Sequence, residues 1–199
     1  MRYTLLFLIA FGLNFFTSCE DAPYVPKPKV YPKINFPEKK YQAFDKDYCA
    51  FTFDFPTYAN IQQDTLFFDE RPKSPCWFNI NFPQFNADIH CSYIKINGKK
   101  SFEKLVNESH FLANKHNIKA DYIDEMKIEK PNHVSGFCFD IEGPAASPFQ
   151  FYLTDSTHHF VRGSLYINTK PNPDSLAPVY KFLKEDIIQM INTFEWNKK

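Results

Sequence analysis

The sequence predicts an α+β fold, a single domain in which a largely antiparallel β-sheet is packed by two helices. Several short stretches alternate apolar and polar side chains with the two-residue period of half-buried strands. Two longer segments show the three- and four-residue spacing of amphipathic helices. Strands lie both before the first helical segment and between the two, an order typical of α+β proteins. The 23 Phe among 199 residues supply an aromatic core.

We expect the first strands at residues 49–55, 65–68, 76–82 and 88–96. Alternation in the third of these places Trp77, Asn79 and Asn81 on one side of the strand, opposite Phe78 and Ile80. The dipeptide Asn97-Gly98 follows the fourth strand and is a turn signal.

The first helix is expected over residues 102–117, with Ser101 as its N-cap. Four further strands follow, at about 122–128, 134–141, 149–154 and 159–168. The stretch Val134–Ile167 is the longest coherent pattern, because clusters of Gly, Pro, Ser and Asp separate its alternating runs.

A second helix is predicted near the C-terminus, with Asp174 or Ser175 as its cap and Pro178 in or near its first turn. Its apolar stripe is expected to join the core. Since several strands alternate cleanly, we expect one face of the sheet to meet both helices.

Residues 1–18 predict a lipoprotein signal peptide. A positive start at Arg2 precedes an apolar run that is too short to be a comfortable membrane span. The following Phe16-Thr17-Ser18-Cys19 resembles a bacterial lipobox, with Phe where Leu is commoner. The resemblance implies cleavage before Cys19 and acylation there, which anchors the chain to a membrane. An ordinary secretory signal with an incidental Cys is the alternative.

Residues 19–40 are expected to form a linker rich in Pro and Lys, which favours extended polyproline II, and residues 41–199 to form the globular domain. Alternatively, Val30, Ile34 and Phe36 dock this segment along the domain.

Four cysteines follow Cys19. Cys49 and Cys76 each open a predicted strand beside loop signals, so a disulfide between them is favoured. Closing this loop of about 28 residues is worth roughly 3–4 kcal/mol in the chain-entropy model. Cys91 and Cys138 lie within strands, and buried thiols are the default expectation for them, with a second disulfide as the alternative.

The formal net charge is zero and no Lys/Arg block exists, so nucleic acid is not an expected partner. No cofactor or metal is expected. His110 and His116 are six residues apart, and the adjacent His158 and His159 point to opposite sides of a strand.

No catalytic residues are predicted. Ser147 lies in Gly143–Pro148, which does not have the GxSxG pattern of a nucleophile elbow. An envelope hydrolase built on Ser147, Asp155 and a His is one alternative, with Asp140 and Glu142 as a further acid–base pair. A small-ligand or lipid-binding module is another, and it predicts a concave apolar pocket.

The lipobox, PKPKVYPKINFPEKKY, CAFTFDFP, CWFNINFP and the segment from Gly143 to Ile187 together resemble the GldD family, gliding-motility lipoproteins of Bacteroidetes. The resemblance covers essentially the whole chain. It implies a non-enzymatic role in the cell-surface gliding machinery and the associated type IX secretion system, with Cys19 as the acylated residue. It implies an outer-membrane lipoprotein that faces the periplasm, with the inner membrane or the cell surface as alternatives. The order of strands and helices is also similar to the PsbP/Mog1-like α/β/α fold.

Phe and Tyr are more numerous than one small core needs, so we expect an exposed aromatic patch for protein partners in the gliding and secretion apparatus. The residues expected to contribute to it are Pro144, Ser147, Phe149, Phe151 and Phe160.

Overall fold

The computed structural model describes residues 33–64, 72 and 74–197. The chain divides into Met1–Lys33 and Ile34–Lys199, and all elements described below belong to the second unit. Ten strands and two α-helices are described within these residues, which confirms the α+β class. The predicted strand at 65–68 lies outside the described residues.

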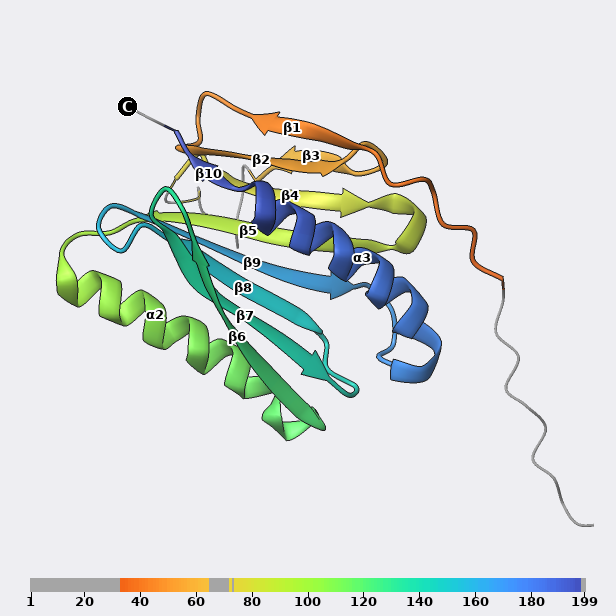
Figure 1. Ribbon diagram of the computed structural model, residues 1–199. Coiled ribbons are helices and arrows are strands. Elements are labelled where there is room, and N and C mark those ends of the chain that lie inside the picture. Colours follow the sequence, from red (N-terminus) through yellow and green to blue (C-terminus); the bar gives the residue numbers. More distant parts are fainter. Residues whose placement is uncertain (1–32, 65–71, 73, 198–199) are drawn as a thin grey trace, which may run out of the picture. The chain divides into compact units, whose positions relative to one another are not determined.

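Most strands form a seven-stranded antiparallel sheet with the order β3-β4-β5-β9-β8-β7-β6 (Figure 1). Its strands are β3 (Asn60–Gln63), β4 (Trp77–Phe82), β5 (Ala87–Lys95), β6 (Tyr122–Lys130), β7 (Val134–Glu142), β8 (Phe149–Thr154) and β9 (His159–Ile167). A second sheet has the order β1-β2-β10, with β1 (Tyr41–Asp45), β2 (Phe51–Pro56) and β10 (Glu195–Trp196).

The two helices cover opposite faces of the large sheet, so the expectation that one face meets both is wrong. Helix α3 (Pro173–Thr193) and the small sheet pack on one face, where Phe44, Phe78 and Leu183 share one core cluster. Helix α2 (Lys99–Asn114) packs on the other face, where Ala113, Phe139 and Tyr152 belong to a second core cluster. Strand β8 is therefore buried along its whole length, because each face of the sheet has its own covering layer (Figure 1).

Aromatic side chains fill the space between the two sheets. The ring of Phe44 on β1 lies 4.6 Å from that of Phe53 on β2 and 4.7 Å from that of Phe78 on β4. The ring of Phe194 lies 5.0 Å from that of Phe51. The large number of Phe residues is thus explained by a core between two layers, which the one-sheet prediction did not contain.

Both predicted helix caps are wrong by a few residues. Helix α2 begins at Lys99 after Gly98, whose positive φ of 77° suits glycine, and Ser101 lies inside its first turn. A 3₁₀ turn, η3 (Lys115–Ile118), continues from its end. Asn172 caps α3 by accepting a hydrogen bond from the Ser175 N–H. Pro173 follows at the first helical position, where its lack of an N–H leaves no donor without a partner.

The segment before β1 packs on the domain. The ring of Phe36 lies 4.7 Å from that of Phe182 on α3 and 5.8 Å from that of Phe85 in η2 (Pro83–Phe85). Gln84 Nε2 donates to the carbonyl of Asn35 over 2.6 Å. These contacts give Phe36 the docking role that was the alternative to an extended linker.

Candidate functional site

Four of the five residues expected to form an exposed partner surface are buried, which corrects that expectation. The exposed fractions are 0% for Ser147 and Phe149, 2% for Phe151 and 1% for Phe160. Phe149 and Phe151 face α3, and Phe160 faces α2, because alternate residues of neighbouring strands enter the two cores. Pro144 alone is exposed. A direct contact role is therefore restricted to the tip of the Gly143–Pro148 loop.

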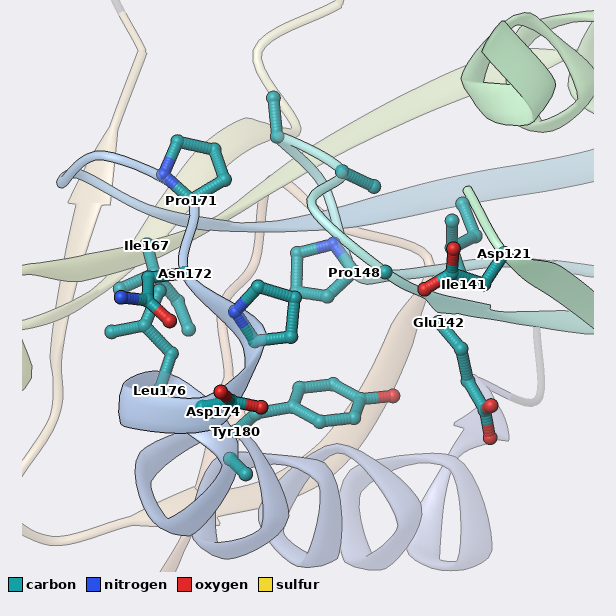
Figure 2. Close-up of a pocket in the computed structure, with 15 residues that line it drawn as sticks. Asp121, Ile141, Glu142, Pro148, Ile167, Pro171, Asn172, Asp174, Leu176 and Tyr180 are labelled. Carbon is teal, nitrogen blue, oxygen red and sulfur yellow. The ribbon is translucent and has the colours of Figure 1, made fainter. Parts of the chain in front are cut away.

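The Gly143–Pro148 loop forms one wall of a pocket of about 420 Å³ (Figure 2). The opposite wall is the start of α3, with Leu176 and Tyr180, together with Pro171 in the preceding loop. The pocket is largely apolar, with carboxylates at its lining. These are Asp121, Glu142 and Asp174. The loop predicted as a protein contact is thus a pocket wall in the structure.

The buried Asp140 carboxylate has two partners on α3, one of which, Tyr180, lines this pocket. Tyr180 Oη donates to Asp140 Oδ1, and Lys184 Nζ donates to Asp140 Oδ2. Burial, followed by the hydrogen bond to Asp140, raises the pKa of Tyr180 well above its usual range. The Asp140–Glu142 pair considered for acid–base chemistry therefore has one member committed to joining β7 to α3.

A second buried carboxylate, Asp186 on α3, joins the segment before β1 to the helix. Its oxygens accept from Lys39 Nζ at 2.7 Å, Tyr41 Oη at 2.9 Å and Tyr58 Oη at 2.5 Å. Burial raises the pKa of both tyrosines, and their hydrogen bonds to Asp186 raise it further. Three donors compensate a carboxylate that is 1% exposed, so this cluster is structural.

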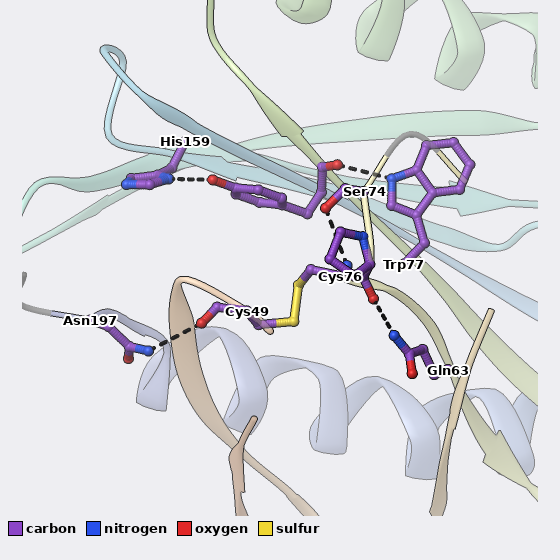
Figure 3. Close-up of a disulfide and its surroundings, with 9 residues drawn as sticks. Cys49, Gln63, Ser74, Cys76, Trp77, His159 and Asn197 are labelled. Carbon is purple, nitrogen blue, oxygen red and sulfur yellow. Dashed lines mark hydrogen bonds between the residues drawn. A yellow bond between two sulfur atoms is a disulfide. The ribbon is translucent and has the colours of Figure 1, made fainter. Parts of the chain in front are cut away.

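Cys49 and Cys76 form a disulfide, with their Cα atoms 5.1 Å apart (Figure 3). It links the turn before β2 to the residue before β4, and Asn197 Nδ2 donates to the Cys49 carbonyl. Cys91 and Cys138 are buried free thiols. Burial raises the pKa of both, to about 12 for Cys138, so neither is a reactive thiolate at neutral pH.

The groups considered for a hydrolase, Ser147, Asp155 and a His, do not form a hydrogen-bonded triad among the described residues. Among the described residues, the buried Ser147 hydroxyl has no hydrogen-bond partner. Asp155 Oδ1 accepts from the backbone N–H groups of Thr157, His158 and His159 at 3.0, 2.8 and 2.8 Å. Burial opposes the charge of Asp155, but these hydrogen bonds prevail and lower its pKa to about 2. Asp155 therefore stabilises its own turn.

A polar groove lies on the α2 side of the large sheet, where α2 leaves β4, β5 and β9 uncovered. The register sets Asn79, His90 and Ser164 in one row across these strands, and Trp77, Ser92 and Arg162 in the next. Helix α2 contributes Leu105, Glu108, Ser109 and Leu112 to the opposite side. The groove encloses about 520 Å³.

Arg162 is the central cation of this groove. Its Nη2 donates to Oε1 of the buried Gln150 over 2.7 Å, which fixes the guanidinium. No carboxylate of the described residues lies within 4 Å of it. Burial lowers the pKa of Arg162, but a guanidinium stays charged at neutral pH. Burial, together with the charge of Arg162, lowers the pKa of the nearby His116.

At the rim of the groove, His90 Nδ1 lies 2.6 Å from Asn79 Oδ1, and its ring lies 5.2 Å from that of Tyr166. Sequence reasoning missed the groove. The signal was present, because Asn79 and Asn81 were assigned to one side of their strand. The order of strands in the sheet was not predicted. Strand β9 is the hydrogen-bonded neighbour of β5 although it lies some 70 residues later in the chain.

Within the described part of the chain, no group of three or more His, Cys, Asp and Glu side chains is placed to hold a metal ion. Over the same residues, no helix is long and apolar enough to cross a membrane.

A model of a protein family described as the gliding motility lipoprotein GldD matches residues 21–196. No curated protein matches the chain. Among solved structures, the chain is similar to the solution structure of cyanobacterial PsbP (CyanoP) from Synechocystis sp. PCC 6803. That likeness has 7% sequence identity and a TM-score of 0.47, and covers 86% of this chain and 99% of the other.

Proposed function

Since the chain belongs to the GldD family of gliding motility lipoproteins, we propose that it is a non-catalytic envelope lipoprotein that supports gliding and the associated type IX secretion machinery. The family match over residues 21–196 is the observation that carries the proposal. The lipobox at Cys19 supports a lipid anchor at the start of the mature chain. On this proposal the domain assembles with other envelope proteins.

The proposed location is the periplasmic face of the outer membrane. The disulfide between Cys49 and Cys76 supports an oxidising compartment, because structural disulfides are rare in reducing cytosol. Cell fractionation with protease protection tests this location. Digestion of the domain in intact cells would contradict it in favour of the cell surface.

The pairing of buried charges supports a structural role for the acidic residues. Asp140 and Asp186 each hold a strand or segment against α3, and Asp155 holds a turn. These carboxylates stabilise the domain that would present a surface to partners.

Affinity capture from detergent-solubilised membranes, followed by identification of the proteins retained, tests the assembly role. We expect specific recovery of envelope proteins of the motility and secretion apparatus by the wild-type chain. A matched Ser147→Ala variant removes the one candidate nucleophile, and cells that carry it should still glide. Loss of gliding with a correctly folded Ser147→Ala protein would favour the hydrolase alternative.

A further inference from the structure

The groove beneath α2 has the composition of a small-molecule site. Its volume of about 520 Å³ lies within the usual range for ligand pockets, roughly 300–1,000 Å³. Its floor is the large sheet, and Arg162 in that floor is held by Gln150 from the neighbouring strand β8. Neither the anchoring nor the assembly proposed above uses this groove.

Arg162 determines which group a ligand must present. A guanidinium has five N–H donors in a planar fork, and among the described residues only Gln150 accepts from it. A carboxylate matches this fork with two parallel hydrogen bonds.

The charges around Arg162 select against polyanions. Asp64 and Glu108 also line the groove, so the three groups sum to a net charge of −1. A nucleotide or a polyphosphate would meet this repulsion, whereas one carboxylate can approach Arg162 alone. The two acidic side chains can instead accept hydrogen bonds from ligand hydroxyls.

The remaining lining residues suit a hydroxylated body. Ser164 lines the groove in the same row as Asn79 and His90. Its hydroxyl can donate a hydrogen bond to a ligand hydroxyl or accept one from it. Asn79 and Ser92 add an amide and a second hydroxyl, and the ring of Tyr166 offers an apolar surface at the edge.

We propose that this groove binds an acidic saccharide, with the carboxylate on Arg162 and the sugar hydroxyls on Asn79 and Ser164. In a carboxylate joined to a ring with several hydroxyls, the carboxylate can pair with the Arg162 guanidinium. The hydroxyls can form hydrogen bonds with Asn79 and Ser164 and donate to the acidic side chains of the groove. A single hexuronate unit is small enough for the groove.

The direct test is calorimetric titration of the full chain in detergent with D-glucuronate, D-glucose, acetate and inorganic phosphate. Glucuronate should bind at least tenfold more tightly than each of the other three. Arg162→Gln should weaken glucuronate binding by roughly 10–100-fold, the loss of a charge-assisted pair. Lys170→Gln, at an exposed position outside the groove, is the matched control and should leave the affinity unchanged.

Amide NMR spectra of the wild-type chain keep the test independent of how well Arg162→Gln folds. Glucuronate should shift the resonances of residues 79, 90, 164 and 166, and Ser164→Ala should weaken binding several-fold without loss of fold. The proposal is overturned if glucuronate gives neither heat nor shifts, or if the shifts lie elsewhere. Equal affinity for phosphate, acetate or glucose also overturns it.

Discussion

Lys39 Nζ lies 2.7 Å from Asp186 Oδ1, and this bond fixes the end of the segment before β1 to the middle of α3. The carboxylate is 1% exposed and the Lys39 side chain is 25% exposed. Lys39 also donates to the Phe182 carbonyl at 2.8 Å and lies over the Phe182 ring. The proline-rich sequence therefore becomes part of the folded domain before residue 41.

Lys39→Met should destabilise the domain, because it leaves a buried carboxylate with only its two tyrosine donors. We expect a loss of about 1–3 kcal/mol in the free energy of unfolding, below the usual cost for a fully buried pair because Lys39 is partly exposed. Urea denaturation measures this loss. Lys40→Met is the matched control, since Lys40 pairs with Glu38 at the surface and should cost less than about 0.5 kcal/mol. Equal effects of the two variants would contradict the structural role of Asp186.

Replacement of both Cys49 and Cys76 by Ser should lower the stability by about 3–4 kcal/mol, because the disulfide closes a long loop of the unfolded chain. Unfolding with and without reductant measures the effect, and reductant should leave the double variant unchanged. Alkylation before unfolding should label neither Cys91 nor Cys138, since both are buried. Peptide mapping that finds Cys49 free under non-reducing conditions would refute the pairing.

Lys130 caps the C-terminal end of α3 from the edge strand β6. Its Nζ donates to the carbonyls of Ile191 and Asn192 at 2.6 and 2.7 Å, where the helix leaves acceptors without partners. Lys130→Met should therefore cost about 1–2 kcal/mol. Lys127→Met on the same strand is the control, because the Lys127 ammonium pairs with the exposed Glu129 side chain at the surface. Thermal unfolding of the two variants should separate them clearly, and a similar change in both would argue against the cap.

Asp155 should make the stability depend on pH at the acidic end. Its pKa is lowered from 3.8 to about 2 in the folded state, so the unfolded state binds the proton first as the pH falls. The stabilisation is fully present above about pH 4 and is lost as the pH falls towards 2. Asp155→Asn should cost about 1–2 kcal/mol at pH 7, and its difference from wild type should shrink over that window. Asp45→Asn, at an exposed position on β1, should show no such convergence.

Much of the large sheet could be predicted from the sequence, because its strands alternate and turn residues separate them. The bounds of β8 were predicted to the residue, and those of β4, β5, β7 and β9 to within one. In the small sheet, β2 corresponds to the strand expected at 49–55, whereas β1 and β10 were missed. Only Phe44 is buried in β1, and β10 has two residues, so neither carries a periodic signal. These short strands hydrogen-bond to the two edges of β2, and for β10 that pairing joins residues far apart in the chain.

The positions of functional groups were harder to predict than the strands. The exposed aromatic patch was expected because Phe and Tyr are more numerous than one small core needs. The fold instead has two cores, one of which buries Phe149 and Phe151 and the other Phe160. The groove around Arg162 depends on strands that are distant in the chain, and alternation alone does not give strand order.

The most direct test of the proposed function is gliding by cells that lack the endogenous protein and carry either the wild-type chain or Cys19→Ala. Both proteins must be present at equal levels, and fatty-acid labelling must show whether each is acylated. We predict that the wild-type chain is labelled and restores gliding together with secretion, whereas Cys19→Ala is unlabelled and restores neither. Full gliding by an unlabelled Cys19→Ala protein would contradict a lipid-anchored role in the motility apparatus.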